Sequence, residues 1–205
     1  MSRDRLIAGG LFALGLAVLA GFALMENGVR TGALAAEDTG GPYLVIEVAG
    51  AAEGRIVIDL RDDVAPQHVE RIIALAERGD YDGVVFHRVI EGFMAQTGDV
   101  QHGKQGESLA MVGTGGSDMG NLPAEFSSLP FERGVVGMAR SQSPNSANSQ
   151  FFIMFAPAPH LNGQYTVVGQ VIEGMDVVDA IKRGDQRGNG AVDDPDWMAS
   201  VTVRR

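Results

Sequence analysis

Residues 85–99 read Val85-Phe86-His87-Arg88-Val89-Ile90-Glu91-Gly92-Phe93-Met94-Ala95-Gln96-Thr97-Gly98-Asp99. The apolar residues alternate along the first half, and Gly92 marks a turn before the second apolar run. This pattern predicts two short strands joined tightly, with Arg88 and Gln96 near each other on one face of the sheet. A cation and an amide beside phenylalanine and methionine are badly suited to a core. They favour a pocket that binds an apolar group and polarises a neighbouring carbonyl.

Length and composition limit the class of protein. The chain has 205 residues, enough for one stable domain and an appendage, and its net charge is −10. Because phosphate binding needs clustered Lys and Arg, this charge argues against a nucleic-acid partner. The lack of cysteine excludes disulfides, thiolate catalysis, cysteine-based zinc sites and a lipoprotein anchor. His68, His102 and His160 show no ligand spacing, so we expect no metal.

Residues 1–25 form a hydrophobic N-terminal segment. The stretch from Leu6 to Met25 has no charged residue, follows Arg3 and Arg5, and as a helix would span about 30 Å. A signal anchor fits this length and the basic flank, and such a helix would contact a membrane. A cleaved signal peptide fits Ala33-Leu34-Ala35 as the cleavage site. We favour the anchor, and both interpretations predict that the domain is exported.

The rest of the chain divides into a linker, residues 26–42, and one domain, residues 43–205. Residues 43–48 and 55–60 have the spacing of neighbouring antiparallel strands, and Pro66 begins a helix that we expect to end near Arg78. Further strands are predicted at 135–139, 150–154, 165–171 and 200–203, and a second helix at 175–182. Residues 100–133 resemble a long irregular loop. About eight strands and two helices predict a mainly β fold, a closed antiparallel barrel.

Three blocks of this domain resemble one known family. They are Phe86-His87-Arg88 through Asp99, Gly137-Met138-Ala139-Arg140 through Ile153, and Leu161-Asn162-Gly163 through Val171. They resemble, in order and spacing, the signatures of cyclophilin-type peptidyl-prolyl cis–trans isomerases. The resemblance implies an eight-stranded antiparallel β-barrel capped by two α-helices, which agrees with the elements predicted above.

The resemblance also implies a set of functional residues and no cofactor. Arg88 matches the catalytic arginine of the family. The family's proline pocket maps onto Phe93, Met94, Phe152 and Leu161, with His160 and Tyr165 at two further pocket positions. Its contacts to the substrate backbone map onto Gln96, Gln150 and the main chain of Arg140, and its neighbouring subsite maps onto Gly113, Thr114, Ala139 and Ser141. The implied partners are proline-containing polypeptides, and we expect a monomer. His87 has the opposite strand phase to Arg88, so we expect it to be buried and hydrogen-bonded.

The chain departs from the family pattern at several positions. His160 stands where a tryptophan is frequent, and the loss of an indole N–H argues against tight binding of cyclosporin. Tyr165 replaces a frequent histidine, as in the bacterial branch, and keeps an aromatic wall. Arg140 replaces a frequent asparagine, and one extra residue lies near Gln142.

These features lead to one function and one alternative. The favoured function is an exported isomerase that rotates Xaa-Pro peptide bonds and assists protein folding, either anchored in the inner membrane with its domain in the periplasm or free in the periplasm. A rotation breaks no bond, so it needs a site that favours the twisted amide rather than a nucleophile or a metal. The alternative is a non-catalytic peptide-binding module or holdase that uses the same groove.

Overall fold

The structure is a computed structural model that describes residues 38–205. The predicted N-terminal segment, residues 1–25, and the linker as far as residue 37 lie outside the described residues. Between residues 38 and 205, no helix combines the length and the apolar character needed to cross a bilayer.

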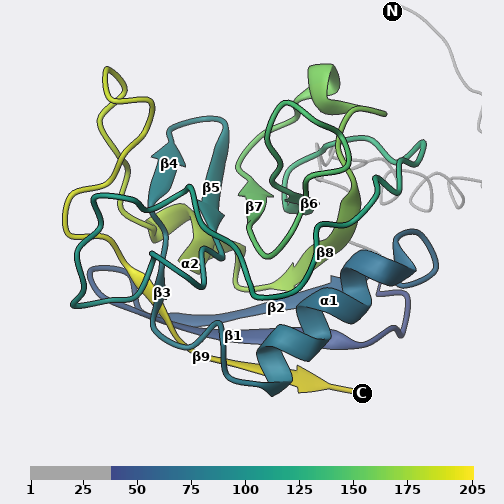
Figure 1. Cartoon of the computed structure of the whole chain (residues 1–205), viewed down its shortest axis with the longest axis horizontal. Helices are drawn as coiled ribbons and strands as arrows, with labels where there is room; N and C mark the ends of the chain where they lie inside the picture. Colours follow the sequence, from purple (N-terminus) through teal and green to yellow (C-terminus); the bar gives the residue numbers. More distant parts are fainter. Residues whose placement is uncertain (1–37) are drawn as a thin grey trace, which may run out of the picture. The chain divides into compact units, whose positions relative to one another are not determined.

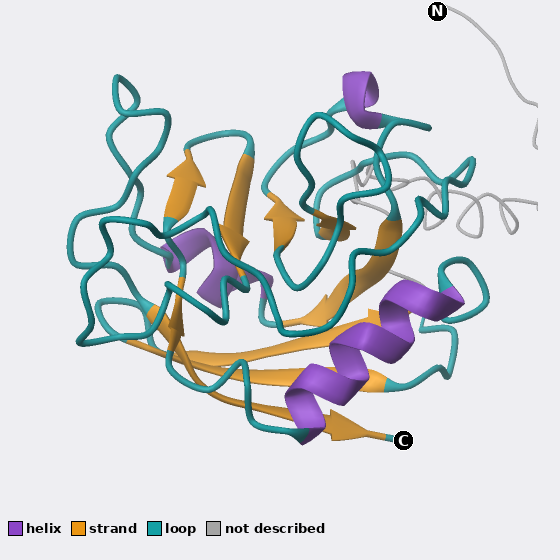
Figure 2. Ribbon diagram, viewed as in Figure 1, coloured by secondary structure: helices purple, strands orange, loops and turns teal. Residues whose placement is uncertain are grey.

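The domain is built on a single antiparallel sheet that curls strongly (Figure 1, Figure 2). Its strands are β1 (Tyr43–Ala49), β2 (Gly54–Leu60), β3 (Val84–Val85), β4 (Arg88–Ile90), β5 (Met94–Thr97), β6 (Val135–Met138), β7 (Phe151–Met154), β8 (Val167–Glu173) and β9 (Trp197–Arg204). Their order is β3-β9-β1-β2-β8-β6-β7-β5-β4. The long strands β1, β2 and β9 lie at the bottom of Figure 1 and the short strands β4 to β7 at the top.

The predicted closed eight-stranded barrel is replaced by nine strands whose hydrogen-bonded order has two ends, β3 and β4. The difference arises within residues 84–90, where one strand was expected. β3 pairs with β9 and β4 pairs with β5, so the two halves of this segment join opposite ends of the sheet. Between them, the backbone N–H of Phe86 donates to Asp196 rather than to a neighbouring strand. The ends of the sheet are therefore connected by the two residues Phe86 and His87.

The alternation of side chains along the short strands separates two apolar clusters. Ala95 and Ile153 point into the main core, which fills the inside of the curled sheet. Met94 and Phe152, their neighbours in sequence, belong to a second cluster on the other face. Because successive side chains of a strand point to opposite faces, the same strands supply both clusters. The second cluster is the apolar floor on which the candidate site lies.

Two α-helices and one short 3₁₀ helix complete the domain: α1 (Pro66–Glu77), α2 (Met175–Ala180) and η1 (Pro159–Leu161). Helix α1 contacts β9 and ends one residue before the predicted position. Helix α2 contacts β2 and is shorter than predicted. It ends because the backbone of Ile181 is extended and the next backbone N–H, that of Lys182, donates to the carboxylate of Asp196 over 2.8 Å. Residues 100–133 form no strand or helix, as expected.

Candidate active site

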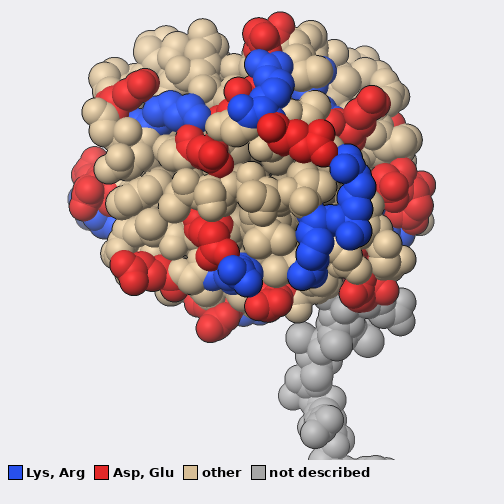
Figure 3. Space-filling view, turned by 90° about the horizontal axis from the view of Figure 1, so that it is seen from below, with Lys and Arg blue, Asp and Glu red and all other residues tan. Residues whose placement is uncertain are grey.

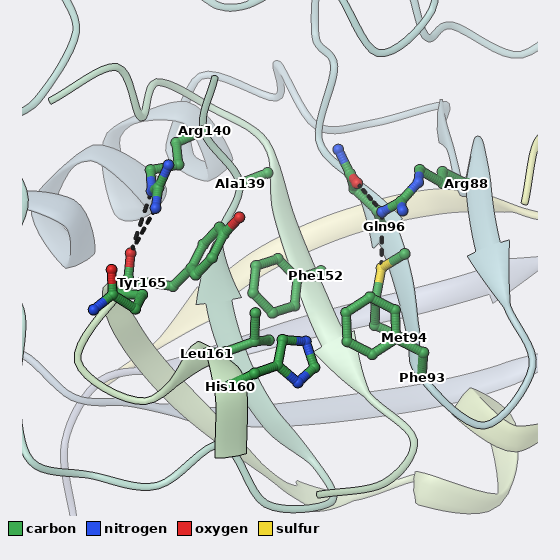
Figure 4. A pocket seen from close by; sticks show the side chains of 11 residues that line it. Arg88, Phe93, Met94, Gln96, Ala139, Arg140, Phe152, His160, Leu161 and Tyr165 are labelled. Carbon is green, nitrogen blue, oxygen red and sulfur yellow. Dashed lines mark hydrogen bonds between the residues drawn. The ribbon is translucent and has the colours of Figure 1, made fainter. Parts of the chain in front are cut away.

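The centre of the site is the pair Arg88 and Gln96, which face each other across the ladder between β4 and β5. Nη1 of Arg88 donates to Oε1 of Gln96 over 3.2 Å and lies 3.8 Å from Sδ of Met94. This arrangement is the one predicted from the spacing of residues 85–99. It places a guanidinium group against an apolar floor, as Figure 4 shows.

A third residue, Asn189, holds the other side of the guanidinium group. Nε of Arg88 donates to the backbone oxygen of Asn189 and Nη2 donates to its Oδ1, both over 3.1 Å. Within residues 38–205, no carboxylate lies within ion-pair distance of Arg88. Burial lowers the pKa of Arg88, yet a guanidinium group stays charged near neutral pH. Arg88 is therefore a fixed cation without a carboxylate partner.

Asn189 was not among the site residues predicted from the sequence. Its φ of 56° is in the left-handed region, which asparagine tolerates better than most residues. It is followed by Gly190, and an Asn-Gly pair is a turn signal. The turn lies alongside β4, because the backbone N–H of Val89 donates to the oxygen of Gly190 over 2.8 Å. The dipeptide could have predicted the turn, but nothing in the local sequence indicates its contact with Arg88.

A line of side-chain amides connects Arg88 to a distant loop. Nε2 of Gln96 donates to Oε1 of Gln150 over 2.9 Å, and Nε2 of Gln150 donates to the oxygen of Gly115 over 2.8 Å. Each amide uses its oxygen toward the arginine and its nitrogen away from it. The orientation of Gln96 is therefore set from both sides.

An apolar cavity of about 490 Å³ lies beside Arg88 (Figure 4). Tyr165 meets Phe152 edge to face with ring centroids 5.8 Å apart, and His160 stacks on Phe93 at the same separation. The cavity is lined by Arg88, Phe93, Met94, Gln96, Ala139, Arg140, Phe152, His160, Leu161, Gln164 and Tyr165. Aromatic walls on several sides and a few polar groups at the rim are typical of a small-ligand pocket.

A second, more polar cavity of about 260 Å³ adjoins the first, and Gln96, Ala139 and Arg140 line both. Asp99 shapes its wall. Its buried carboxylate accepts the backbone N–H groups of Gln101, His102, Gly113 and Gly115 over 2.7–3.1 Å. The complete lining is Gln96, Gly113, Thr114, Gly115, Ala139, Arg140, Ser141, Ser146, Asn148 and Gln150.

All of the site residues predicted from the sequence line one of these two cavities. Four further residues contribute to the linings and were not predicted from the sequence: Gln164, Gly115, Ser146 and Asn148. Among the described residues, no group of His, Cys, Asp and Glu side chains is arranged to hold a metal ion.

His87 is buried, as predicted, but the expected hydrogen bond is not found. It is 6% exposed, and neither ring nitrogen has a partner among residues 38–205. The ring packs against Gly113, and a Cβ added to that glycine would lie 3.3 Å from the ring. Burial lowers the pKa of His87 to about 4, so the ring is neutral near pH 7.

Comparison with known proteins identifies the family. Residues 43–203 match the model of the family described as cyclophilin type peptidyl-prolyl cis-trans isomerase/CLD. The chain belongs to the cyclophilin family. The resemblance stated from the three sequence blocks is thereby confirmed, together with the isomerase function of the family.

Relatives of this cyclophilin carry the same activity in their names. A protein of Brucella suis biovar 1 (strain 1330), named "Probable peptidyl-prolyl cis-trans isomerase", is 60% identical over 153 residues, covering 74% of this chain and 78% of the relative. The Arabidopsis thaliana "Peptidyl-prolyl cis-trans isomerase CYP18-1" is 41% identical over 138 residues, covering 67% and 81%.

Solved cyclophilin structures share the fold. The Hirschia baltica cyclophilin AquaCyp293 matches with a TM-score of 0.64 and 26% identity, covering 78% of this chain and 73% of that chain. A Cryptosporidium parvum cyclophilin crystallised in the presence of the dipeptide Ala-Pro matches with a TM-score of 0.67 and 25% identity, covering 80% and 99%.

Proposed function

We propose that the chain catalyses rotation about Xaa-Pro bonds by holding the proline ring in the apolar cavity and stabilising the twisted amide with Arg88. The barrier to rotation is about 18–20 kcal/mol because the C–N bond has partial double-bond character. At the top of the barrier the proline nitrogen regains a lone pair. A hydrogen-bond donor can bind this nitrogen or the neighbouring proline carbonyl. It lowers the barrier if it binds the twisted amide better than the planar forms.

The observation that carries this proposal is the state of Arg88. A structural arginine in a half-buried position normally pairs with a carboxylate, but the partners of Arg88 in residues 38–205 are neutral. Its guanidinium group has five N–H donors, and four contacts are made, one of them the weak contact to Met94. Donor capacity therefore remains for a substrate, with no proton transfer.

The surrounding groups support the same assignment. Phe93, Met94, Phe152 and Leu161 would fix the ring, while Gln96, Gln150 and the main chain of Arg140 would bind the polypeptide backbone. The crystal structure of the Cryptosporidium parvum relative is one in the presence of the dipeptide Ala-Pro, which supports proline-containing polypeptides as substrates. The alternative is a binding module or holdase, which would need the cavity but not the unpaired cation.

Exchange NMR on a short Ala-Pro peptide tests the proposal. We expect the protein to accelerate cis–trans exchange, and Arg88→Ala to lower kcat/KM roughly 10- to 150-fold, the equivalent of one or more charge-assisted hydrogen bonds. Arg205→Ala removes an exposed arginine that pairs with Glu77 and serves as the control. An unaccelerated exchange would favour the binding module, and an accelerated exchange that Arg88→Ala leaves unchanged would overturn the catalytic role of Arg88.

We also propose that the domain lies outside the inner membrane, where it assists the folding of exported proteins. We propose further that it is a monomer. The uncharged stretch Leu6 to Met25 behind Arg3 and Arg5 supports a membrane anchor or a signal peptide. Mass spectrometry of the protein from its native membranes should find an intact N-terminus if the segment is an anchor, or one beginning near Ala36 if it is cleaved. Light scattering of the purified protein should give the monomer mass. Recovery of the protein in the cytoplasmic fraction would contradict the export proposal.

A further inference from the structure

The lining of the two cavities differs in charge from the rest of the molecule. The chain has 26 acidic and 16 basic residues, and on the face shown in Figure 3 acidic and basic side chains are interspersed. Among residues 38–205, the charged side chains that line the two cavities are those of Arg88 and Arg140, and the nearby carboxylate of Asp99 is buried behind the wall of the second cavity. A groove that carries only positive charge, on an acidic protein, is a local feature of the site.

Arg140 is held in a fixed position at the ridge between the cavities. Its Nη2 and Nε donate to the oxygen of Gln164 over 3.0 and 3.3 Å, and Nη1 donates to the oxygens of Ser141 and Gln142 over 2.9 and 3.4 Å. Its guanidinium carbon lies 4.3 Å from the centre of the Tyr165 ring. Figure 4 shows it on the opposite side of the cavity from Arg88.

The charge of Arg140 is oriented but not neutralised. The arginines of residues 38–205 that form ion pairs are Arg55, Arg61, Arg78, Arg133, Arg183 and Arg205. The partners of Arg140 are neutral carbonyl groups and an aromatic ring. Four of its five N–H donors are used, which leaves one on Nη2. A preorganised guanidinium group with a free donor suits a carboxylate.

We infer that the groove prefers polypeptides with an acidic side chain close to the Xaa-Pro bond, and that Arg140 selects for that side chain. This inference rests on the proposed function, in which the proline ring occupies the apolar cavity. The chain on one side of the proline then crosses the ridge formed by Gln96, Ala139 and Arg140 into the second cavity. A carboxylate there meets a fixed cation and no competing carboxylate.

Exchange NMR with matched peptides tests the inference. The peptides share an Ala-Pro core and carry Glu, Gln or Lys in turn at each of the three positions before and after it. At low ionic strength we expect kcat/KM for the Glu peptide to exceed that for the Lys peptide about two- to fivefold at one position, the range of a partly exposed ion pair. The preference should vanish near 1 M salt, where the screening length is about 3 Å.

Variants of Arg140 separate charge selection from a purely structural role. Arg140→Gln should lower the rate on the Glu peptide more than the rates on the Gln and Lys peptides, which removes the preference, and Arg140→Glu should reverse the preference. Arg205→Glu changes the net charge by the same amount as Arg140→Glu. It does so at the C-terminus, away from the cavities, and should therefore keep the preference.

The outcomes are distinguishable. No acceleration on any peptide would overturn the proposed function. Equal wild-type rates on the Glu, Gln and Lys peptides would overturn only the acidic preference. If Arg140→Gln lowers the rates on all peptides by one common factor, Arg140 is a latch between the loops at residues 141–142 and 164, and the inference is wrong.

Discussion

Arg88 and Gln96 are direct partners across the β4–β5 ladder, and the arginine donates to the side-chain oxygen of the glutamine over 3.2 Å. Together with the two hydrogen bonds to Asn189 and the weaker contact to Met94, this bond sets the direction of the guanidinium group. The strand register therefore positions a cation at the edge of an apolar cavity. Several consequences of this arrangement can be measured.

Asn189→Gly should lower kcat about two- to tenfold with little change in KM, because the left-handed backbone is retained while one hydrogen bond to the guanidinium group is lost. Exchange NMR over a range of peptide concentrations separates the two parameters. Asp194→Gly is the matched control, since Asp194 also has a positive φ and lines neither cavity. An unchanged kcat in Asn189→Gly would show that Arg88 needs no such support.

Gln150→Leu should raise KM, because the amide nitrogen of Gln96 loses its acceptor and the loop at Gly115 loses a donor. Gln150→Glu keeps an acceptor for Gln96 but no donor for Gly115, so we expect an intermediate KM. Peptide titrations followed by NMR shifts give the affinities directly. Equal affinities in the two variants would mean that the bond between Gln96 and Gln150 is unimportant.

Gly137→Ala should damage both the site and the fold. A Cβ on this residue would lie 2.6 Å from carbon atoms of Phe131 and Phe152, so the rings must move. We expect a loss of about 1–3 kcal/mol in the free energy of unfolding, measured by urea denaturation, and weaker peptide binding. Gly120→Ala, at a position with open space for a Cβ, should be close to neutral. A stable and fully active Gly137→Ala variant would contradict this packing.

His87 should make the folded state less stable as the pH falls from about 6.5 to 4. Burial lowers its pKa to about 4 in the folded state, whereas an unfolded histidine titrates near 6.5. Between these values the unfolded chain binds a proton that the folded chain does not, which removes about 3 kcal/mol by pH 4.

Urea denaturation at pH 7 and pH 4 measures this effect. Between pH 7 and pH 4 the wild type should lose about 3 kcal/mol more of its free energy of unfolding than His87→Gln loses. An equal difference in the wild type and His87→Gln would show that the buried ring is not responsible.

The hairpin of β4 and β5 was predictable because its information is local. Alternating apolar residues on either side of Gly92 determine which side chains share a face, and the register then follows from a short turn. The apolar floor was implied by the resemblance to the family, because periodicity alone does not separate Met94 and Phe152 from ordinary core residues. The residue types of the motif, an arginine and a glutamine among aromatic side chains, also indicated the kind of chemistry.

Contacts between distant segments were not predictable in this way. Asn189 is separated from Arg88 by 101 positions, and the turn that carries it has no pattern that indicates its neighbour. The division of residues 84–90 between β3 and β4 depends on which strands lie on either side, β9 and β5. The resemblance to the family implied only a contact between the main chain of Arg140 and the substrate, whereas the structure shows the Arg140 side chain fixed between two loops.

The sequence by itself determined most of the strands, the helix α1 and the shared face of Arg88 and Gln96, whereas the remaining site residues were implied by the resemblance to the cyclophilin family. Periodicity and turn residues act over a few positions, so they are visible in the chain. Only the tertiary structure decided what surrounds each polar group: among residues 38–205, Arg88 has neutral partners, Arg140 lies between two loops, and His87 has no hydrogen-bond partner. Hydrogen-bond partners and dielectric surroundings come from segments far apart in sequence, which meet only when the sheet curls.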